Sequence, residues 1–263
     1  MRLWQKTGLV ALIVVLAAGA TLWWLPARWA LPWLQRSLPG LRLQQVAGTL
    51  WNGRAGHVLA DDGEVLGRAQ WRLSRMALLG RSQLWLDVTG SRLDLRGEVR
   101  RLVDDEVEWR NVAARLDLAV LSDPKRRLLP LRLRGELALR TSRVLLQGGW
   151  PRDGEVVLVW RNAALKTRFG DVSLGHLDAQ MTAQDGIVHA QWHATEDSPL
   201  RARGTLAASP LGWRAQAELQ ARADAPLLQR WLASLGRPDA SGILHLERHG
   251  GLAAAPLPEK AAP

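Results

Sequence analysis

Apolar and polar residues alternate along most of the chain after about position 41. Residues 213–222 show the pattern most clearly, because every second residue is apolar and those between are Arg, Gln or Glu. The same period of two recurs over 93–96, 106–110, 116–120, 131–134 and 189–195. Successive side chains of a strand point to opposite faces, so this period predicts strands with one buried and one solvated face.

Turn-forming residues separate the alternating stretches. They are Asp62-Gly63, Gly148-Gly149, Asp153-Gly154, Gly170-Asp171, Asp185-Gly186 and Ser209-Pro210-Leu211-Gly212. Short strands joined by regularly spaced turns predict a mainly β fold, built as a meandering, curved antiparallel sheet.

Two short stretches have helical rather than strand character. Residues 74–79 follow a strand-like segment, and residues 225–235 carry one apolar stripe at helical spacing. For the second helix, Asp224 is a capping residue, Pro226 suits the first turn and Gly236 ends it. A last strand is expected over 242–247.

The N-terminus predicts a single transmembrane helix. Arg2 and Lys6 precede an uncharged, mostly apolar run over 8–25, and Pro26 ends it. At ~1.5 Å per residue this run can cross a ~30 Å hydrocarbon core, and the flanking cations favour a cytoplasmic N-terminus. The alternative is a cleavable signal peptide, because Ala18-Gly19-Ala20 resembles a cleavage site. Both interpretations place the rest of the chain outside the cytoplasm.

These features divide the chain into five segments. We expect a cytoplasmic N-terminus over 1–7, a transmembrane anchor over 8–25, an interfacial linker over 26–40, a periplasmic β-rich domain over 41–252 and a disordered tail over 253–263. Residues 28–38 mix Trp and Leu with Arg, so they fit the membrane surface or, equally, a short helix packed on the domain.

The amino-acid composition limits the kinds of site and partner that the protein can have. The 263 residues include no cysteine, which excludes disulfides, thiolate metal sites and a cysteine nucleophile. The net charge of +10 fits nucleic acid, an anionic membrane surface or an acidic partner, but export argues against nucleic acid. Most arginines fall on the polar phase of strands and are expected to be solvated. Of the 14 tryptophans, Trp109, Trp192 and Trp213 fall in strand pattern and are expected in the core.

No set of residues in the sequence has the pattern that catalysis, cofactor binding or metal binding requires. Residues 48–55 approach a phosphate-binding loop, but Arg54 replaces its lysine and Ala55 its hydroxyl residue. The pairs His189/His193 and His245/His249 lie on expected strands, where a solvated position is the better interpretation. The acidic pairs at 61–62 and 104–105 adjoin expected turns, and no G-x-S-x-G elbow occurs. We therefore expect no enzyme and no cofactor.

The chain resembles protein N of the type II (general) secretion pathway. The stretch 46–55 is similar to that family's V-x-G-T-[LV]-W-x-G-x-A block, and 67–80 and 232–252 are similar to two further blocks. The resemblance implies a non-enzymatic inner-membrane protein that supports export of folded proteins across the outer membrane. It implies inner-membrane platform proteins and the outer-membrane secretin as partners, besides inner-membrane lipid. The block residues Val46, Gly48, Thr49, Leu50, Trp51, Gly53 and Ala55 are expected to be structural, with Trp51 filling the core beside a glycine turn.

An anchor followed by amphipathic strands also resembles the AsmA-like periplasmic proteins. That likeness implies a concave sheet whose apolar groove takes lipid acyl chains. An apolar sheet face must be covered by helices, by the sheet itself, by a partner or by lipid, so the pattern leaves both functions open. An exported hydrolase is the weakest reading, since no catalytic set is present.

Overall fold

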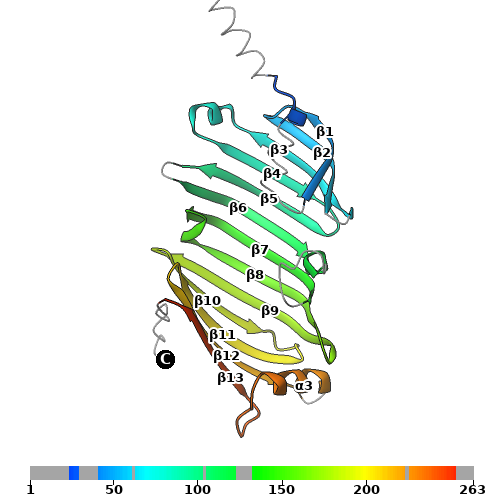
Figure 1. Ribbon diagram of the computed structural model, residues 1–263, viewed down its shortest axis with the longest axis vertical. Coiled ribbons are helices and arrows are strands. Elements are labelled where there is room, and N and C mark those ends of the chain that lie inside the picture. The colour runs from blue at the N-terminus through cyan, green and yellow to red at the C-terminus, as the bar shows by residue number, and fades with distance from the viewer. Residues whose placement is uncertain are drawn as a thin grey trace, which may run out of the picture.

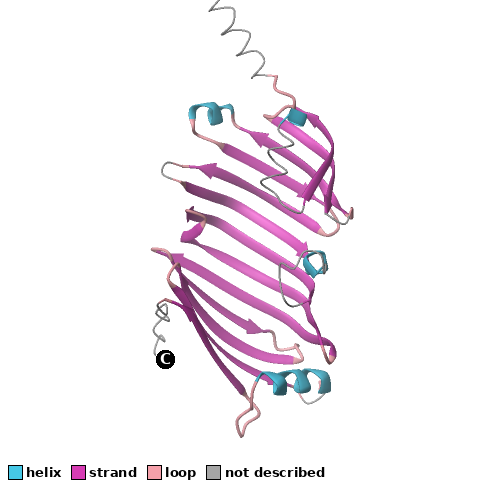
Figure 2. Ribbon diagram, viewed as in Figure 1, coloured by secondary structure: helices cyan, strands magenta, loops and turns pink. Residues whose placement is uncertain are grey.

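Thirteen strands form one antiparallel sheet in the order β1 to β13, so each strand is hydrogen-bonded to its neighbours along the chain (Figures 1 and 2). The structure is a computed structural model that describes residues 24–29, 41–60, 63–102, 105–122, 132–222 and 225–252. The prediction of a mainly β, meandering antiparallel sheet is confirmed.

The strands range from seven residues in β4 to 18 in β8. Their bounds are β1 Leu41–Gly48, β2 Asn52–Ala60, β3 Val65–Leu73, β4 Gln83–Thr89, β5 Leu93–Arg101, β6 Glu106–Asp117, β7 Arg132–Gln147, β8 Trp150–Thr167, β9 Gly170–Gln184, β10 Ile187–Ala194, β11 Leu200–Ser209, β12 Gly212–Ala221 and β13 Leu244–Gly251. In the described part of the chain they are accompanied by the 3-10 helices η1, Arg75–Leu79, and η2, Leu118–Ser122, by the α-helix α3, Pro226–Leu235, and by a short helical segment at residues 27–29.

Several predictions concern residues that the structure does not describe, most of them near the two ends of the chain. They concern 1–7, the anchor up to residue 23, the linker over 30–40 and the tail from 253, together with the acidic residues at 61, 62 and 104. In the ranges that the structure describes, no helix is both long enough and apolar enough to cross a membrane.

Two tight hairpins follow the predicted turn chemistry. Gly148 and Gly149 join β7 to β8 with φ values of +56° and +81°, and Asp185 and Gly186 join β9 to β10 with +50° and +79°. Two successive residues at positive φ are typical of a type I′ turn, whose twist matches that of the strands. The predicted turn at 209–212 is also confirmed between β11 and β12.

The turn expected at Gly170-Asp171 falls at residues 168–169 instead, because Gly170 and Asp171 already belong to β9 and pair with the end of β8. Three further predictions about the strands need correction. Asp153-Gly154 is not a turn but an irregularity inside β8, where Gly154 has a φ of +139° and the register with β7 shifts. The alternation over 116–120 does not continue as a strand, because β6 ends at Asp117 and its carboxylate accepts a hydrogen bond from the Ala119 amide at 2.9 Å. This local bond competes with the sheet ladder and starts η2. The last strand begins at residue 244 and runs to 251.

Both predicted helices are present. Ser74 accepts a hydrogen bond from the Met76 amide at 3.3 Å at the start of η1, and Gly80 closes that element at a φ of +82°. Pro226 occupies the first turn of α3, which ends before Gly236. Asp224 lies outside the described residues, and the N-cap position, Ala225, makes no side-chain capping bond.

Two hydrophobic cores lie toward opposite ends of the sheet. The N-terminal core centres on Ala55, Val58, Ala60, Leu66, Ala69, Val88 and Val120. The C-terminal core centres on Ala163, Leu165, Val172, Leu174, Leu200, Leu219, Leu228, Leu232 and Leu244. Helix α3 supplies two of its members and lies at the β13 end of the sheet (Figure 1).

Candidate functional site

One face of the sheet carries an unbroken apolar row from the first strand to the last. Directly paired residues of neighbouring strands lie on the same face, so the strand registers trace this row residue by residue. We call it the central row: Val46, Ala55, Ala69, Val88, Leu95, Ala114, Leu139, Leu158, Ala179, Trp192, Gly204, Ala217 and Leu246.

The residues next to the central row along each strand lie on the opposite face of the sheet, and most of them are polar. There the paired residues are Ala47, Arg54, Gln70, Asp87, Arg96, Ala113, Arg140, Val157, Gln180, Gln191, Thr205, Gln216 and Glu247. All but Ala47, Ala113 and Val157 are polar. The sheet therefore has an apolar face and a polar face over its whole length.

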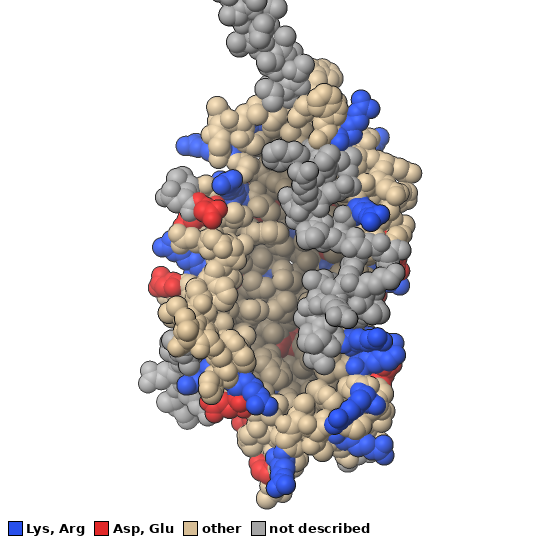
Figure 3. Space-filling view, in the orientation of Figure 1, with Lys and Arg blue, Asp and Glu red and all other residues tan. Residues whose placement is uncertain are grey.

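Two further apolar rows widen the apolar face on either side of the central row. One contains Leu93, Leu116, Leu137, Trp160, Leu177 and Ala194. The other contains Leu73, Leu84, Val99, Trp109, Val144, Gly154, Ala183, Val188, Ala208, Trp213 and Gly250. Figure 3 shows a hollow along the molecule, with few charged side chains in its floor; the Lys, Arg, Asp and Glu side chains visible in this view lie mainly at its rim.

The apolar face deepens into a cavity beside α3. The cavity has a volume of about 380 Å³ and is lined by Leu137, Leu158, Trp160, Leu174, Leu177, Ala179, Trp192, Leu200, Leu219 and Trp231. Three of these residues belong to the central row, and Trp231 comes from α3. No lining side chain is charged, so the cavity offers dispersion contacts and excludes charge.

Tryptophan rings cover glycines on this face in three places. Trp71 lies opposite Gly53, Trp192 opposite Gly204 and Trp213 opposite Gly250, each as a direct cross-strand pair. A Cβ atom added at those glycines would come within 2.3, 2.4 and 2.8 Å of the respective indole. The rings thus occupy the space that a side chain would need, which is how aromatic residues protect glycines in sheets. Trp213 is 41% exposed, so the prediction that it is a core residue is wrong for this position near the edge.

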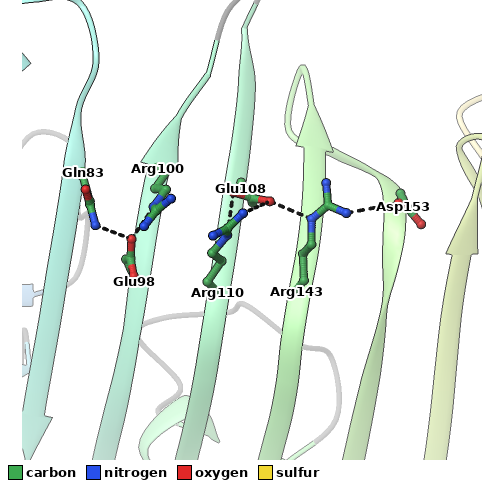
Figure 4. A network of polar contacts seen from close by, with 7 residues as sticks. All are labelled: Gln83, Glu98, Arg100, Glu108, Arg110, Arg143 and Asp153. Atoms are coloured by element: carbon green, nitrogen blue, oxygen red, sulfur yellow. Dashed lines mark hydrogen bonds and ion pairs between the residues drawn. The ribbon is translucent and has the colours of Figure 1, made fainter.

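Among the described residues, the polar face contains one buried carboxylate. Glu108 is 3% exposed, and its oxygens lie 2.7 Å from Nε of Arg110 and 2.6 Å from Nε of Arg143 (Figure 4). Arg110 and Arg143 are a direct cross-strand pair of like charges, which Glu108 neutralises. Hydrogen bonds from Arg110 lower the pKa of Glu108, burial opposes this, and Arg143 lowers it further.

The burial of Glu108 could not be predicted from the sequence. The period of two places it on a solvated face, with Glu106 as an equivalent neighbour. Only the register, which sets Glu108 between Arg100 of β5 and Leu145 of β7, distinguishes the two. Beside it, Glu98 accepts hydrogen bonds from Arg100 and Gln83, which extends the polar network across β4, β5 and β6 (Figure 4).

The conspicuous block over 46–55 forms the β1–β2 connection. Gly48 ends β1 at a φ of +89°, and Thr49 and Asn52 close the turn, with Asn52 donating its amide to Thr49 Oγ1 at 3.1 Å. Trp51 is 5% exposed, and the Leu50 carbonyl accepts a hydrogen bond from Trp71 Nε1 at 3.1 Å. Val46 and Ala55 begin the central row. The geometry is that of a strand end and turn, without a phosphate cradle.

A second hollow, of about 610 Å³, lies beside this turn and η1. Its lining mixes polar and apolar residues, among them Trp51, Arg72, Gln83, Trp85 and Glu98. The Arg72 guanidinium lies 4.8 Å from the ring centre of Trp85, a distance typical of cation–π contacts. The contact between Arg72 and Trp85 stabilises the polar face.

The histidine pairs are dispersed. His189 and His193 lie on one face of β10, paired across strands with Thr182 and Asp178 respectively. His245 Nε2 lies 3.0 Å from Oδ2 of Asp239, whose pKa is lowered chiefly by hydrogen bonds from Ser241 and the Ile243 amide. Among the described residues no three His, Asp or Glu side chains gather closely enough to hold a metal ion.

Comparisons with known proteins agree in one name. A family model described as "Type II secretion system (T2SS), protein N" matches residues 39–247. Type II secretion system protein N of Vibrio cholerae serotype O1 is 29% identical over 241 residues, which is 87% of this chain and 91% of that protein. Type II secretion system protein N of Aeromonas hydrophila is 26% identical over 256 residues, which is 94% of this chain and 98% of that protein. No solved structure matches.

Proposed function

Because the chain belongs to the type II secretion system protein N family, we propose that it is a non-enzymatic accessory component of that secretion apparatus. In this role it supports export of folded proteins from the periplasm across the outer membrane. The observation that carries the proposal is the family match over 39–247, which covers nearly all of the sheet.

The architecture supports a binding role. Both faces of the sheet are long, and one is predominantly apolar and the other predominantly polar from β1 to β13, which suits contact with extended surfaces. The polar groups that come together on the described residues, such as Glu108 with its two arginines, are paired with each other. Paired groups of this kind stabilise a fold.

The placement in the cell is part of the proposal. Residues 8–25 anchor the chain in the inner membrane with the N-terminus in the cytoplasm, and the domain over 41–252 lies in the periplasm. Its partners there are the inner-membrane platform proteins and the outer-membrane secretin. The support is the apolar run with cations before it, which favours this orientation.

Deletion of the gene in its own host tests the role. We expect less secreted exoprotein in the medium and more in the periplasm, with recovery when the full chain is supplied from a plasmid. Affinity purification of the tagged full chain from membranes should bring down platform proteins or secretin. Unchanged secretion together with no recovered apparatus protein would refute the proposal.

The alternative, an AsmA-like protein that transfers lipid, receives no support from the family match. The feature that suggested it, an apolar sheet face, is nevertheless present. Its occupant is a separate question from membership of the secretion apparatus.

A further inference from the structure

We infer that the apolar cavity between α3 and strands β7–β12 binds one acyl chain of an anionic phospholipid. The cavity is the part of the apolar face that has walls as well as a floor. Leu137, Leu158 and Ala179 lie on the sheet, and Trp231 of α3 lines the cavity from the helix. Its volume of about 380 Å³ is within the ~300–1,000 Å³ range of small-molecule sites.

The chemistry of the lining selects an alkyl chain. All ten lining residues are Leu, Trp or Ala. The indole N–H of Trp160 is already used, because it donates to the Arg134 carbonyl at 3.0 Å. Apart from the tryptophan indoles, the lining side chains carry no polar atoms, so an occupant with several buried polar groups would leave most of them unpaired, at a cost of several kcal/mol per group in an apolar medium. An alkyl chain has no such groups.

The same reasoning disfavours an extended polypeptide. A peptide segment brings one N–H and one C=O per residue, and these must be paired when buried. The backbone groups of the floor strands are engaged in the sheet ladders on both sides, since β8, β9, β10 and β11 are interior strands. A peptide could therefore satisfy its backbone only at a sheet edge, whereas the cavity lies away from the edges.

Two observations favour an anionic membrane phospholipid as the source of the bound acyl chain. The apolar run over 8–25 precedes the described domain and, as a membrane anchor, would tether the whole chain to a bilayer, with the cavity lying toward the β13 end of the sheet (Figure 1). The chain carries a net charge of +10, and Lys and Arg side chains are prominent on the rim of the hollow in Figure 3. Asp and Glu also lie on this rim but are fewer in this view, and an excess of Lys and Arg attracts an anionic head group while the acyl chain enters the apolar interior.

Adjacent residues of β8 offer a matched experiment. Leu158 lines the cavity, whereas Val157 lies on the opposite face and is 44% exposed. The photo-reactive residue p-benzoylphenylalanine is placed at one or the other position of the full chain in its host membrane. After irradiation, the purified protein is analysed by mass spectrometry. We expect a phospholipid adduct from position 158 at least tenfold above that from position 157.

A blocking variant separates occupation of the cavity from general membrane contact. Ala179→Trp fills the cavity and should abolish the adduct from position 158, whereas Gln180→Trp on the polar face should leave it unchanged. Circular dichroism of each full-length variant establishes that the sheet is formed. If a folded A179W chain still gives the full adduct, the cavity is not the binding site.

The identity of the adduct decides the occupant. Purified full chain mixed with vesicles of phosphatidylglycerol or of phosphatidylcholine should give more adduct with phosphatidylglycerol. Equal adducts from the two vesicles, a free fatty acid, a polypeptide adduct or no adduct at position 158 would each overturn the inference. The readout does not depend on secretion, so this inference and the proposed function can fail separately.

Discussion

Gly204→Ala should destabilise the protein, although an alanine in mid-strand is ordinarily the better residue. Gly204 lies in the interior of β11 with no positive φ, so its backbone accepts a side chain. Its cross-strand partner is Trp192, whose indole comes within 2.4 Å of the place that a Cβ atom would take. Trp192 also packs against the C-terminal core, and these contacts limit how far the ring can move.

The expected magnitude follows from two opposing terms. Replacing a strand-interior glycine by alanine stabilises by about 0.5–1 kcal/mol through the unfolded chain. Inserting a methyl group into occupied space costs about 1–3 kcal/mol. These terms leave a net loss of up to about 2.5 kcal/mol. Because the indole occupies the place of the added Cβ atom, we expect G204A to lower the free energy of unfolding. In a Trp192→Leu background the indole is absent, so the same substitution should be neutral or stabilising.

The measurement is a double-mutant cycle by urea unfolding, followed by far-ultraviolet circular dichroism. Wild type, G204A, W192L and the double variant are compared as full chains. The reasoning requires a coupling energy between positions 192 and 204 of about 1–3 kcal/mol. A G204A chain more stable than wild type, or additive effects in the cycle, would refute the packing of the indole on the glycine.

Three other predictions concern the core, the buried carboxylate and the β1–β2 turn. Leu228→Ala, at a residue 2% exposed on α3, should cost about 2.7–5 kcal/mol, whereas Leu227→Ala, at a neighbour 39% exposed, should cost far less in the same unfolding assay. Glu108→Gln should destabilise by about 1.5–3 kcal/mol at neutral pH, because hydrogen bonds to charged groups are lost. The pKa of Glu108 is lowered in the folded state, so its contribution to the free energy of unfolding is full above the usual carboxyl range and is lost as the pH falls through that lowered pKa. The stability difference between wild type and E108Q should therefore shrink in acid, and a constant difference would contradict this. Trp71→Phe removes the bond to the Leu50 carbonyl and should cost about 1 kcal/mol, with Trp85→Phe as a comparison that keeps that bond.

Alternation in the sequence was sufficient to predict the sheet because the physical cause is local. In β12, for example, every second residue from 213 to 221 is apolar, and this alone places those residues on one face. The turns at 148–149 and 185–186 are equally local, since glycine or aspartate at positive φ is the main requirement. The meander then follows from joining neighbouring strands.

The features that escaped prediction depend on register, which no local pattern specifies. The burial of Glu108 depends on which residues of β5 and β7 stand opposite it. The glycine–tryptophan pairs involve residues 12, 18 and 37 positions apart that meet only when two strands align. Likewise Asp153-Gly154 has turn chemistry but continues β8, because the strand pairs with β7 on both sides of it. The role of the block over 46–55 as a family motif stays a prediction.

The strictly sequential strand order has a consequence for how the molecule is made. From β2 on, each strand is hydrogen-bonded to the strand just before it in the sequence, so its pairing does not require a segment that is distant in the sequence. A chain that emerges N-terminus first can therefore add strands one at a time, with short loop closures at every step. The same order makes the length of the sheet adjustable, because a hairpin inserted or removed leaves the pairing of the remaining strands unchanged.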